Sequence, residues 1–327
     1  MAVFVHERML QLFEAEGINT LFGIPDPSFV GMFICAEERG WQVIAPHHEQ
    51  AGAFMADGLW RMTGKPGVIV GNQGPGVANL AAGAICAAKE NVPTLFIAGQ
   101  RQREFDQRVR RGRFQYTRQP RYFEEAMKFV GTIEFPEQTD EIVHEAFRHA
   151  LSGTPGPVYI EYPMNVLQAQ LDLPAPAAPD RYRLVGQAAS EPELARALAL
   201  IQAADAPILL VGQGAFVSRA HDAVAELARA LCCPLIQTPG APAVLPGLED
   251  RTFPYASPAG TEAVAGADLV IAVGTEIGEP LHYGIGRHWA KGNTDRKWIY
   301  VEREPLAIGV NRSIDAPLVK SKSKEKR

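Results

Sequence analysis

Residues 42–76 read QVIAPHHEQAGAFMADGLWRMTGKPGVIVGNQGPG, and this stretch decides the fold. A short apolar run at residues 42–45 precedes a helix-length periodic segment at residues 50–63, and a second apolar run follows at residues 67–70. The order strand, helix, strand is typical of a parallel sheet that is covered by helices. A glycine-rich turn, Gln73–Gly76, follows the second run and opens another helical segment.

The same alternation extends over residues 1–165. Strands are expected at residues 20–24, 42–45, 67–70, 94–98 and 158–161, where Val and Ile are frequent. Helices are expected at residues 4–16, 29–39, 50–63, 77–89 and 139–152. The strand segments are mostly apolar on both faces, as strands buried in a parallel sheet must be. Residues 1–165 are therefore predicted to form a doubly wound α/β domain.

A Pro- and Ala-rich stretch, LDLPAPAAPD (171–180), ends this series, and residues 166–188 are expected to be an interdomain linker. A second series follows, with helices at residues 192–203, 218–230 and 261–265 and strands at residues 207–211, 234–237, 269–273 and 298–301. It predicts a second doubly wound, Rossmann-like domain over residues 189–319. The last residues, KSKSKEKR (320–327), are expected to form a disordered basic tail.

Composition excludes several classes of protein. The chain has 46% hydrophobic residues and a net charge of -5, which favour an ordinary globular protein without general attraction to nucleic acid. No apolar run is long enough for a membrane span, and the first residues do not resemble a signal peptide. Four cysteines without C-x-x-C spacing favour a reducing cytoplasm.

An arginine cluster has two interpretations. It could steer a carboxylate- or phosphate-bearing substrate, or it could be a solvated loop and interface between subunits. It consists of Arg101, Arg103, Arg108, Arg110, Arg111, Arg113, Arg118 and Arg121.

Three blocks stand at the carboxyl ends of predicted parallel strands, where open α/β sheets place their ligands. They are Phe22-Gly23-Ile24-Pro25, His48-Glu49-Gln50 and Gln73-Gly74-Pro75-Gly76. In this order and spacing they resemble the pyrimidine-binding domain of thiamine-diphosphate enzymes of the acetolactate synthase family. The segments ILLVGQGA and GADLVIAVGTEIG resemble the central domain of the same family, so the likeness covers nearly the whole chain.

The resemblance implies a catalytic role for Glu49, which would hydrogen-bond to the pyrimidine ring of the cofactor and so activate its C2 carbon. Alternatively, Glu49 sits favourably at a helix N-terminus. His48 has a positional role in the family, and His47 and His48 could both be structural. Gln115, in the family's F-Q element, is implied as a second catalytic residue, although Tyr116 replaces the usual acidic residue.

The resemblance further implies a set of cofactor-binding residues. Gly74 and Gly76 could instead allow a helix to pack closely on the sheet. Asn72 and Gln73 stand where the family usually has Ser or Thr before the first glycine of this turn. The set comprises Gly23, Ile24, Pro25, Glu49, Gly74, Pro75, Gly76 and Asn79.

The family's G-D-G motif, which binds Mg²⁺ and the diphosphate in a third domain, does not occur in this sequence. No metal ligand is predicted in this chain, and Mg²⁺ is expected in a domain that the chain lacks. FAD is a further cofactor of acetolactate synthases, but the Arg and Asp pair that hold it have no match in Gly274–Gly278. The chain could be a truncated product, a shifted reading frame, or one subunit of a split enzyme.

The sequence therefore predicts the N-terminal half of a thiamine-diphosphate-dependent carboligase or lyase that acts on a 2-oxo acid or a related acyl donor. Acetolactate synthase, 2-hydroxyacyl-CoA lyase and benzoylformate decarboxylase-like activities are all open. The expected partners are a second copy, bound through the pyrimidine-binding domain, and a separate diphosphate-binding subunit; without the latter no turnover is expected. The alternative is a non-catalytic dimerising or regulatory homologue.

Overall fold

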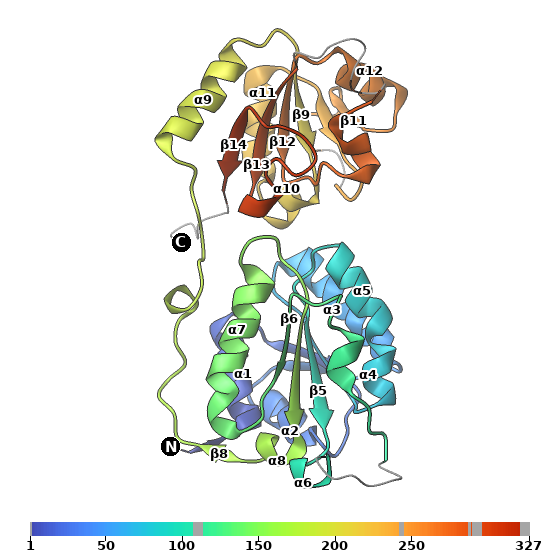
Figure 1. Cartoon of the computed structure of the whole chain (residues 1–327), viewed down its shortest axis with the longest axis vertical. Coiled ribbons are helices and arrows are strands. Elements are labelled where there is room, and N and C mark those ends of the chain that lie inside the picture. The colour runs from blue at the N-terminus through green and yellow to red at the C-terminus, as the bar shows by residue number, and fades with distance from the viewer. Residues whose placement is uncertain (1, 107–113, 242–244, 287–288, 290–295, 321–327) are drawn as a thin grey trace. The chain divides into compact units, whose positions relative to one another are not determined.

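The computed structural model describes residues 2–106, 114–241, 245–286, 289 and 296–320. The chain divides into two compact units, with the boundary in the sequence between Leu184 and Val185 (Figure 1). The basic tail from residue 321 and Arg108, Arg110, Arg111 and Arg113 lie outside the described residues. Each unit is built on a parallel sheet with helices on both faces, which confirms the predicted fold class. No helix in the described ranges has the length and apolar character needed to cross a membrane.

The first unit contains six parallel strands in the spatial order β3-β2-β4-β5-β7-β6. They are β2 (Thr20–Gly23), β3 (Gln42–Ile44), β4 (Val68–Gly71), β5 (Leu95–Gln100), β6 (Phe129–Thr132) and β7 (Val158–Pro163). A two-stranded antiparallel pair, β1 (Val3–Phe4) with β8 (Gln170–Leu171), lies beside them. The sequence did not predict β6, β1 or β8.

Helices cover both faces of this sheet. The helix predicted at residues 77–89 is divided in two, α4 and α5. On one face α1 packs against α2 and α7, and on the other α3 packs against α4 and α5 (Figure 1). The helices are α1 (Val5–Ala15), α2 (Val30–Glu38), α3 (Glu49–Thr63), α4 (Pro75–Asn79), α5 (Ala81–Lys89), α6 (Arg103–Asp106), α7 (Thr139–Leu151) and α8 (Met164–Leu167), with 3₁₀ turns at Gln119–Tyr122, Pro136–Gln138 and Pro179–Arg181.

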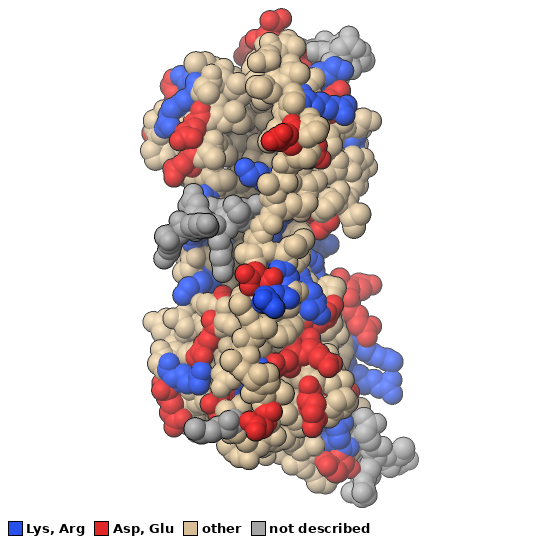
Figure 2. Space-filling view, turned by 90° about the vertical axis from the view of Figure 1, so that its left-hand side faces the viewer, with Lys and Arg blue, Asp and Glu red and all other residues tan. Residues whose placement is uncertain are grey.

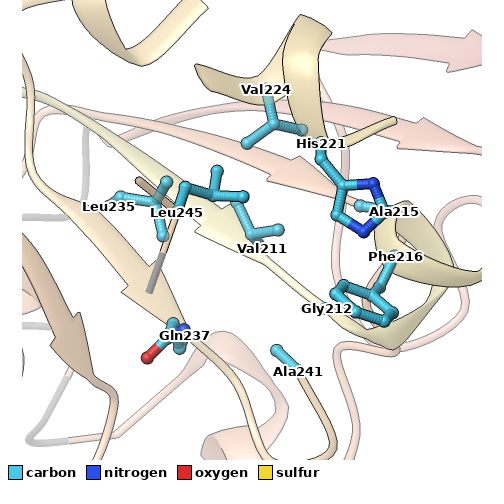
Figure 3. Close-up of a pocket in the computed structure, with 10 residues that line it drawn as sticks. All are labelled: Val211, Gly212, Ala215, Phe216, His221, Val224, Leu235, Gln237, Ala241 and Leu245. Carbon is cyan, nitrogen blue, oxygen red and sulfur yellow. The ribbon is translucent and has the colours of Figure 1, made fainter. Parts of the chain in front are cut away.

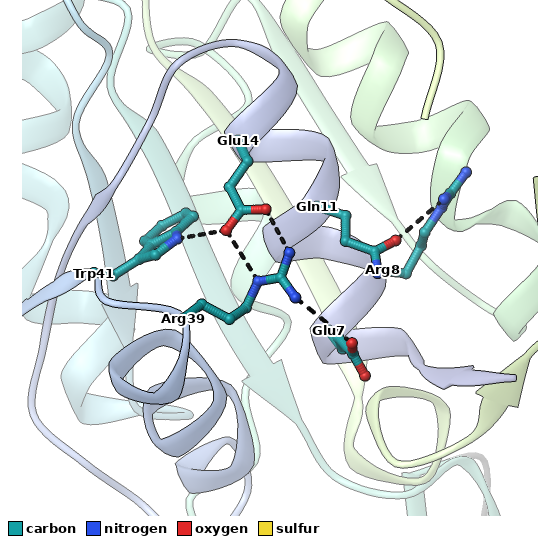
Figure 4. A network of polar contacts seen from close by, with 6 residues as sticks. All are labelled: Glu7, Arg8, Gln11, Glu14, Arg39 and Trp41. Atoms are coloured by element: carbon teal, nitrogen blue, oxygen red, sulfur yellow. Dashed lines mark hydrogen bonds and ion pairs between the residues drawn. The ribbon is translucent and has the colours of Figure 1, made fainter. Parts of the chain in front are cut away.

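Polar side chains join α1 to α2 at the edge of an apolar core (Figure 4). The Arg39 guanidinium donates to both oxygens of Glu14, at 2.9 and 2.5 Å, and the Trp41 indole nitrogen donates to the same carboxylate at 2.9 Å. Burial by itself would raise the pKa of Glu14, but the hydrogen bonds from Arg39 and Trp41 outweigh it and lower the pKa. Glu14 therefore stays ionised and holds the two helices together.

Residues 166–184, which the sequence assigns to a linker, make specific contacts with the first unit. Leu171 is buried, and the Arg183 guanidinium donates to both oxygens of Glu16 at 2.7 and 2.5 Å. The Tyr182 hydroxyl donates to Glu16 as well, and its ring stacks on His144 with centroids 4.0 Å apart. The Pro-rich segment is thus fastened to α1 and α7.

The second unit has a parallel sheet in the order β11-β10-β9-β12-β13-β14. Its strands are β9 (Pro207–Val211), β10 (Leu235–Gln237), β11 (Thr252–Pro254), β12 (Leu269–Val273), β13 (Lys297–Glu302) and β14 (Ala316–Val319). Helices α9 and α11 cover one face and α12 the other. The helices are α9 (Glu191–Gln202), α10 (Gln213–Val217), α11 (His221–Leu231) and α12 (Pro258–Gly266), with 3₁₀ turns at Glu279–Gly284 and Pro305–Ala307.

Acidic and basic side chains are interspersed over both units on the face shown in Figure 2. Two arginines of the cluster are engaged with the protein: Arg101 donates to the Phe114 carbonyl at 2.7 Å, and Arg103 pairs with Glu134 at 2.6 Å. Arg118 and Arg121 are exposed. The described part of the cluster therefore includes both loop-stabilising and solvent-facing arginines.

Candidate functional site

The strand order of the first unit creates a point where the direction of sheet growth reverses. From β2 the chain first adds β3 on one side and then returns to add β4 on the other. Open α/β sheets bind ligands at such a point, outside the carboxyl ends of the strands. Gly23 ends β2 there, and the segments that follow β3 and β4 carry Glu49 and Gly76. These three residues belong to the three blocks singled out in the sequence.

Glu49 is the first residue of α3, and its side chain is buried at 7% exposure. His48 caps the helix, because its Nδ1 accepts a hydrogen bond from the Gln50 amide at 3.2 Å, whereas His47 is exposed. Asn79, on α4, donates from Nδ2 to Oε2 of Glu49 at 2.9 Å. Within the described residues the other oxygen, Oε1, makes no hydrogen bond. The carboxylate thus has one oxygen held in place and one available to a ligand.

Gly76 lies against this available oxygen. A Cβ on Gly76 would stand 2.8 Å from Glu49 Oε1 and 2.9 Å from Asn72 Cβ, closer than real Cβ atoms approach. Glu49 and Asn72 therefore flank the same point, and only glycine leaves that point free. The Oδ1 atom of Asn72 is buried and has no hydrogen-bond partner in the described chain, which is unusual for a polar atom in a protein interior.

Replacing Gly76 with Ala is expected to push the Glu49 carboxylate away from its position, because this carboxylate is the end of a flexible side chain. The backbone at Asn72 must shift as well, because the added Cβ would also stand too close to the Asn72 Cβ. We expect a loss of about tenfold or more in any activity that depends on Glu49, since misplaced catalytic groups lose that much. Gly266→Ala is the control, because a Cβ there meets nothing within 4 Å. Equal activity of both variants would contradict the close approach.

Gly74 and Gln115 contact each other through their backbones. Gly74 has φ +69°, and a Cβ on it would collide with the Gln115 carbonyl oxygen. Gln115 itself has φ +52° and is half-exposed. The structure thus places Gln115 next to the glycine-rich turn, with its backbone as the contacting part.

Gly23, at the end of β2, is required for a different reason. A Cβ on Gly23 would stand 2.8 Å from the Val70 carbonyl oxygen and 2.9 Å from the Phe33 ring. Gly23 is therefore required by the packing of β2 between β4 and α2. Ile24 is half-buried and Pro25 exposed at the carboxyl edge.

Sequence reasoning missed three buried polar residues beneath the glycine-rich turn: Gln119, Tyr159 and Glu161. The Gln119 side chain accepts a hydrogen bond from the Gly74 amide at 2.7 Å and donates to Glu161 at 2.8 Å. One signal was present in the sequence. Glu161 interrupts the apolar run VYIEYP, and a carboxylate in a buried strand needs hydrogen-bond donors around it.

The second unit contains a mostly apolar pocket at the carboxyl ends of β9 and β10 (Figure 3). Its lining residues are Val211, Gly212, Ala215, Phe216, His221, Val224, Leu235, Gln237, Ala241 and Leu245. The glycines of Gly212-Gln213-Gly214, beside this pocket, pack directly on Gly274, and the Gly214 amide donates to the Gly274 carbonyl at 2.8 Å. Packing therefore accounts for this glycine pair. Among the described residues no three His, Cys, Asp or Glu side chains group as metal ligands.

Each of the two units matches a family of known proteins. The family model for the N-terminal TPP binding domain of thiamine pyrophosphate (thiamine diphosphate) enzymes matches residues 5–122, and the model for their central domain matches residues 194–323. An acetolactate synthase of Arthrospira platensis is 32% identical over 93% of this chain and 54% of its own length. A 2-hydroxyacyl-CoA lyase of Arabidopsis thaliana is 28% identical over 88% of this chain and 50% of its own length.

A probable acetolactate synthase large subunit of Methanococcus aeolicus is 28% identical over 96% of this chain and 52% of its own length. The chain thus spans about half the length of the curated relatives it matches. This chain contains two consecutive domains of one family. Glu49, the glycine-rich turn Gln73–Gly76 and the point at β2 where the strand order reverses all lie in the first domain. The chain belongs to the thiamine pyrophosphate enzyme family, of which it carries the N-terminal TPP binding domain and the central domain.

Proposed function

We propose that Glu49 is the carboxylate that contacts the pyrimidine ring of thiamine diphosphate in a carboligase or lyase. The observation that carries this proposal is the geometry of one side chain. Glu49 is buried, Asn79 holds one of its oxygens, and the other oxygen faces a point that only glycine at position 76 leaves free. A ring nitrogen that shares a proton with a carboxylate requires this combination of a fixed and a free oxygen.

Thiamine diphosphate, when bound, supplies a carbon acid at C2 and an electron sink for the acyl group. The protein supplies orientation and electrostatics around it. Glu49 would hold a proton at Oε1, and Asn79 would keep the carboxylate from turning away. The unpartnered Oδ1 of Asn72 offers an acceptor beside Glu49, which fits a ligand that carries N–H donors.

The substrate class proposed is a 2-oxo acid or a related acyl donor. This proposal is supported by the names of the relatives, which include acetolactate synthases and a 2-hydroxyacyl-CoA lyase. We further propose that Mg²⁺ and the diphosphate are held by another domain, in the same polypeptide or in a separate one, because the relatives are about twice as long as this chain. FAD in the second unit stays a prediction from the resemblance alone.

The direct test is the exchange rate of the cofactor's C2 proton with deuterium, measured by proton NMR after acid quenching. The protein is mixed with thiamine diphosphate, Mg²⁺ and a diphosphate-binding domain of a relative. The proposal is supported if the wild-type protein accelerates exchange and Glu49→Gln slows it by about a hundredfold or more. If the two proteins behave alike, the non-catalytic alternative holds.

We also propose that the first unit binds a second copy of itself through α3 and α5. These two helices pack together and expose Phe54 (43%), Met55 (45%) and Ile85 (54%), and clustered exposed apolar side chains mark interaction surfaces. Ile85→Glu is expected to shift the sedimentation velocity from dimer to monomer. Phe135→Glu, at an equally exposed position (51%) before a 3₁₀ turn, is the control. A monomeric wild-type protein at tens of micromolar would contradict this.

A further inference from the structure

A buried polar network lies directly beneath the glycine-rich turn. Gln119 is fully buried, and every polar atom of its side chain is used. Its Oε1 accepts from the Gly74 amide at 2.7 Å, and its Nε2 donates to Glu161 Oε2 at 2.8 Å and to the Gly99 carbonyl at 3.1 Å. This single side chain therefore joins the turn after β4 to strands β5 and β7.

Glu161 determines which way the Gln119 amide points. It is a 4% exposed carboxylate on β7, and Tyr159 also donates to its Oε2, at 3.1 Å. Burial and the nearby Glu161 raise the pKa of Tyr159, so its hydroxyl keeps its proton and stays a donor. Because a carboxylate and a carbonyl oxygen both face the Gln119 amide nitrogen, the amide oxygen must face Gly74.

The Gly74 turn is therefore clamped from two sides. Gln119 holds its amide, and the Gln115 carbonyl packs where a side chain on Gly74 would be. Gly74 is the residue before α4, the helix that carries Gly76 and Asn79, and both of these residues lie against the Glu49 carboxylate. A shift of the turn would thus move both contacts of Glu49 together.

We propose that Gln119 is a positioning residue for Glu49: through the Gly74 amide it fixes the turn on which the Glu49 carboxylate rests. The inference rests on the proposed function of Glu49, and Gln119 contacts no reacting group itself. It acts at a distance through one backbone hydrogen bond, whose direction is set by the buried Glu161.

The first experiment needs no cofactor. Deuterium uptake of the backbone amides of residues 72–76 is measured by mass spectrometry on the full chain, for the wild type and for Gln119→Met, which keeps the size of the side chain and removes its hydrogen bonds. Uptake is expected to accelerate about tenfold, the factor that one lost hydrogen bond represents. Gln138→Met is the control, since Gln138 is a partly exposed glutamine whose side chain accepts from the Glu134 amide.

A second pair of variants guards against loss of the fold. Gln119→Glu alone places two carboxylates in contact and is expected to accelerate uptake more strongly than Gln119→Met. Adding Glu161→Gln restores one amide and one carboxylate, with the donor now on β7 and the acceptor at position 119. It is expected to recover part of the wild-type protection, because the acceptor for the Gly74 amide returns while the hydrogen bond to the Gly99 carbonyl stays lost. Failure of this exchanged pair to recover any protection would overturn the proposed network.

The third measurement is the C2-proton exchange described for Glu49. Gln119→Met is expected to lower its rate about tenfold at saturating cofactor, with little change in cofactor affinity, because Gln119 orients Glu49 and leaves binding intact. Unchanged deuterium uptake at residues 72–76, or unchanged C2 exchange despite faster uptake, would overturn the inference. If the wild-type protein does not accelerate C2-proton exchange at all, the proposed function of Glu49 is refuted. The deuterium uptake of residues 72–76 is measured without cofactor, so it still tests whether Gln119 holds the turn.

Discussion

Replacing Glu49 with Gln is expected to slow C2-proton exchange of bound thiamine diphosphate by about 10²–10⁴-fold, the range that a positioned acid–base group contributes. The amide of Gln has the shape of the carboxylate and can still accept from Asn79, which now donates to Glu49 at 2.9 Å. It cannot exchange a proton with a ring nitrogen. The variant therefore separates the chemical role of Glu49 from its place at the start of α3.

Glu141→Gln serves as the matched control, because Glu141 is an exposed glutamate in the first turn of α7. Both variants lose one negative charge near a helix N-terminus, so a small common loss of stability is expected, at most about 1 kcal/mol each. Only Glu49→Gln should lose cofactor activation. If Glu49→Gln retained wild-type exchange, Glu49 would be a helix-terminal carboxylate and no more.

Removing Asp140 is expected to have the largest effect on stability. Arg8, on α1, is 2% exposed and pairs with Asp140, on α7, through Nε to Oδ1 at 2.7 Å and Nη2 to Oδ2 at 2.5 Å. A further hydrogen bond of Arg8, from Nη1 to Gln11, is long at 3.3 Å (Figure 4). Asp140→Ala would leave a buried guanidinium without its counter-ion, which costs about 3–5 kcal/mol of unfolding free energy.

The measurement is the urea dependence of deuterium uptake in α1 and α7, which reports on the first unit separately from the second. Glu145→Ala is the control: its pair with Arg148 is a third or more exposed on both sides, so the loss should stay within about 1 kcal/mol. The double variant Arg8→Leu/Asp140→Leu should be less destabilised than Asp140→Ala, because it buries no unpaired charge. Equal losses of unfolding free energy in Asp140→Ala and Glu145→Ala would show that the buried pair stabilises the unit no more than an exposed pair does.

The central strands and the edge strand β3 could be predicted from the sequence, whereas the edge strands β6, β11 and β14 could not. Strands β4 and β5 stand out as apolar runs, and β7 stands out as an apolar run that Glu161 interrupts. Strands β11 and β14 are short and contain Pro254 and Pro317. Proline is tolerated at a sheet edge, where its missing amide faces no neighbour, yet in a sequence it argues against a strand.

The linker illustrates a second limit. Proline-rich composition correctly indicates the absence of a long helix between residues 171 and 180, where the structure has one 3₁₀ turn, Pro179–Arg181. Composition says nothing about where such a segment lies. Its attachment depends on Arg183 meeting Glu16, a contact between residues 167 positions apart.

The sequence by itself determined the alternation of strands and helices, the place of Glu49 at a helix start after a strand, and the glycines of the turn that follows β4. These features are local, because periodicity, helix ends and turns depend on neighbouring residues. Only the tertiary structure decided that Asn79 holds Glu49, that Gln119 holds Gly74 and that Asp140 neutralises Arg8. In each of these contacts a polar side chain meets a side chain or a backbone amide that is far away in the chain. Such a contact exists only once the order of the strands has brought the two segments together.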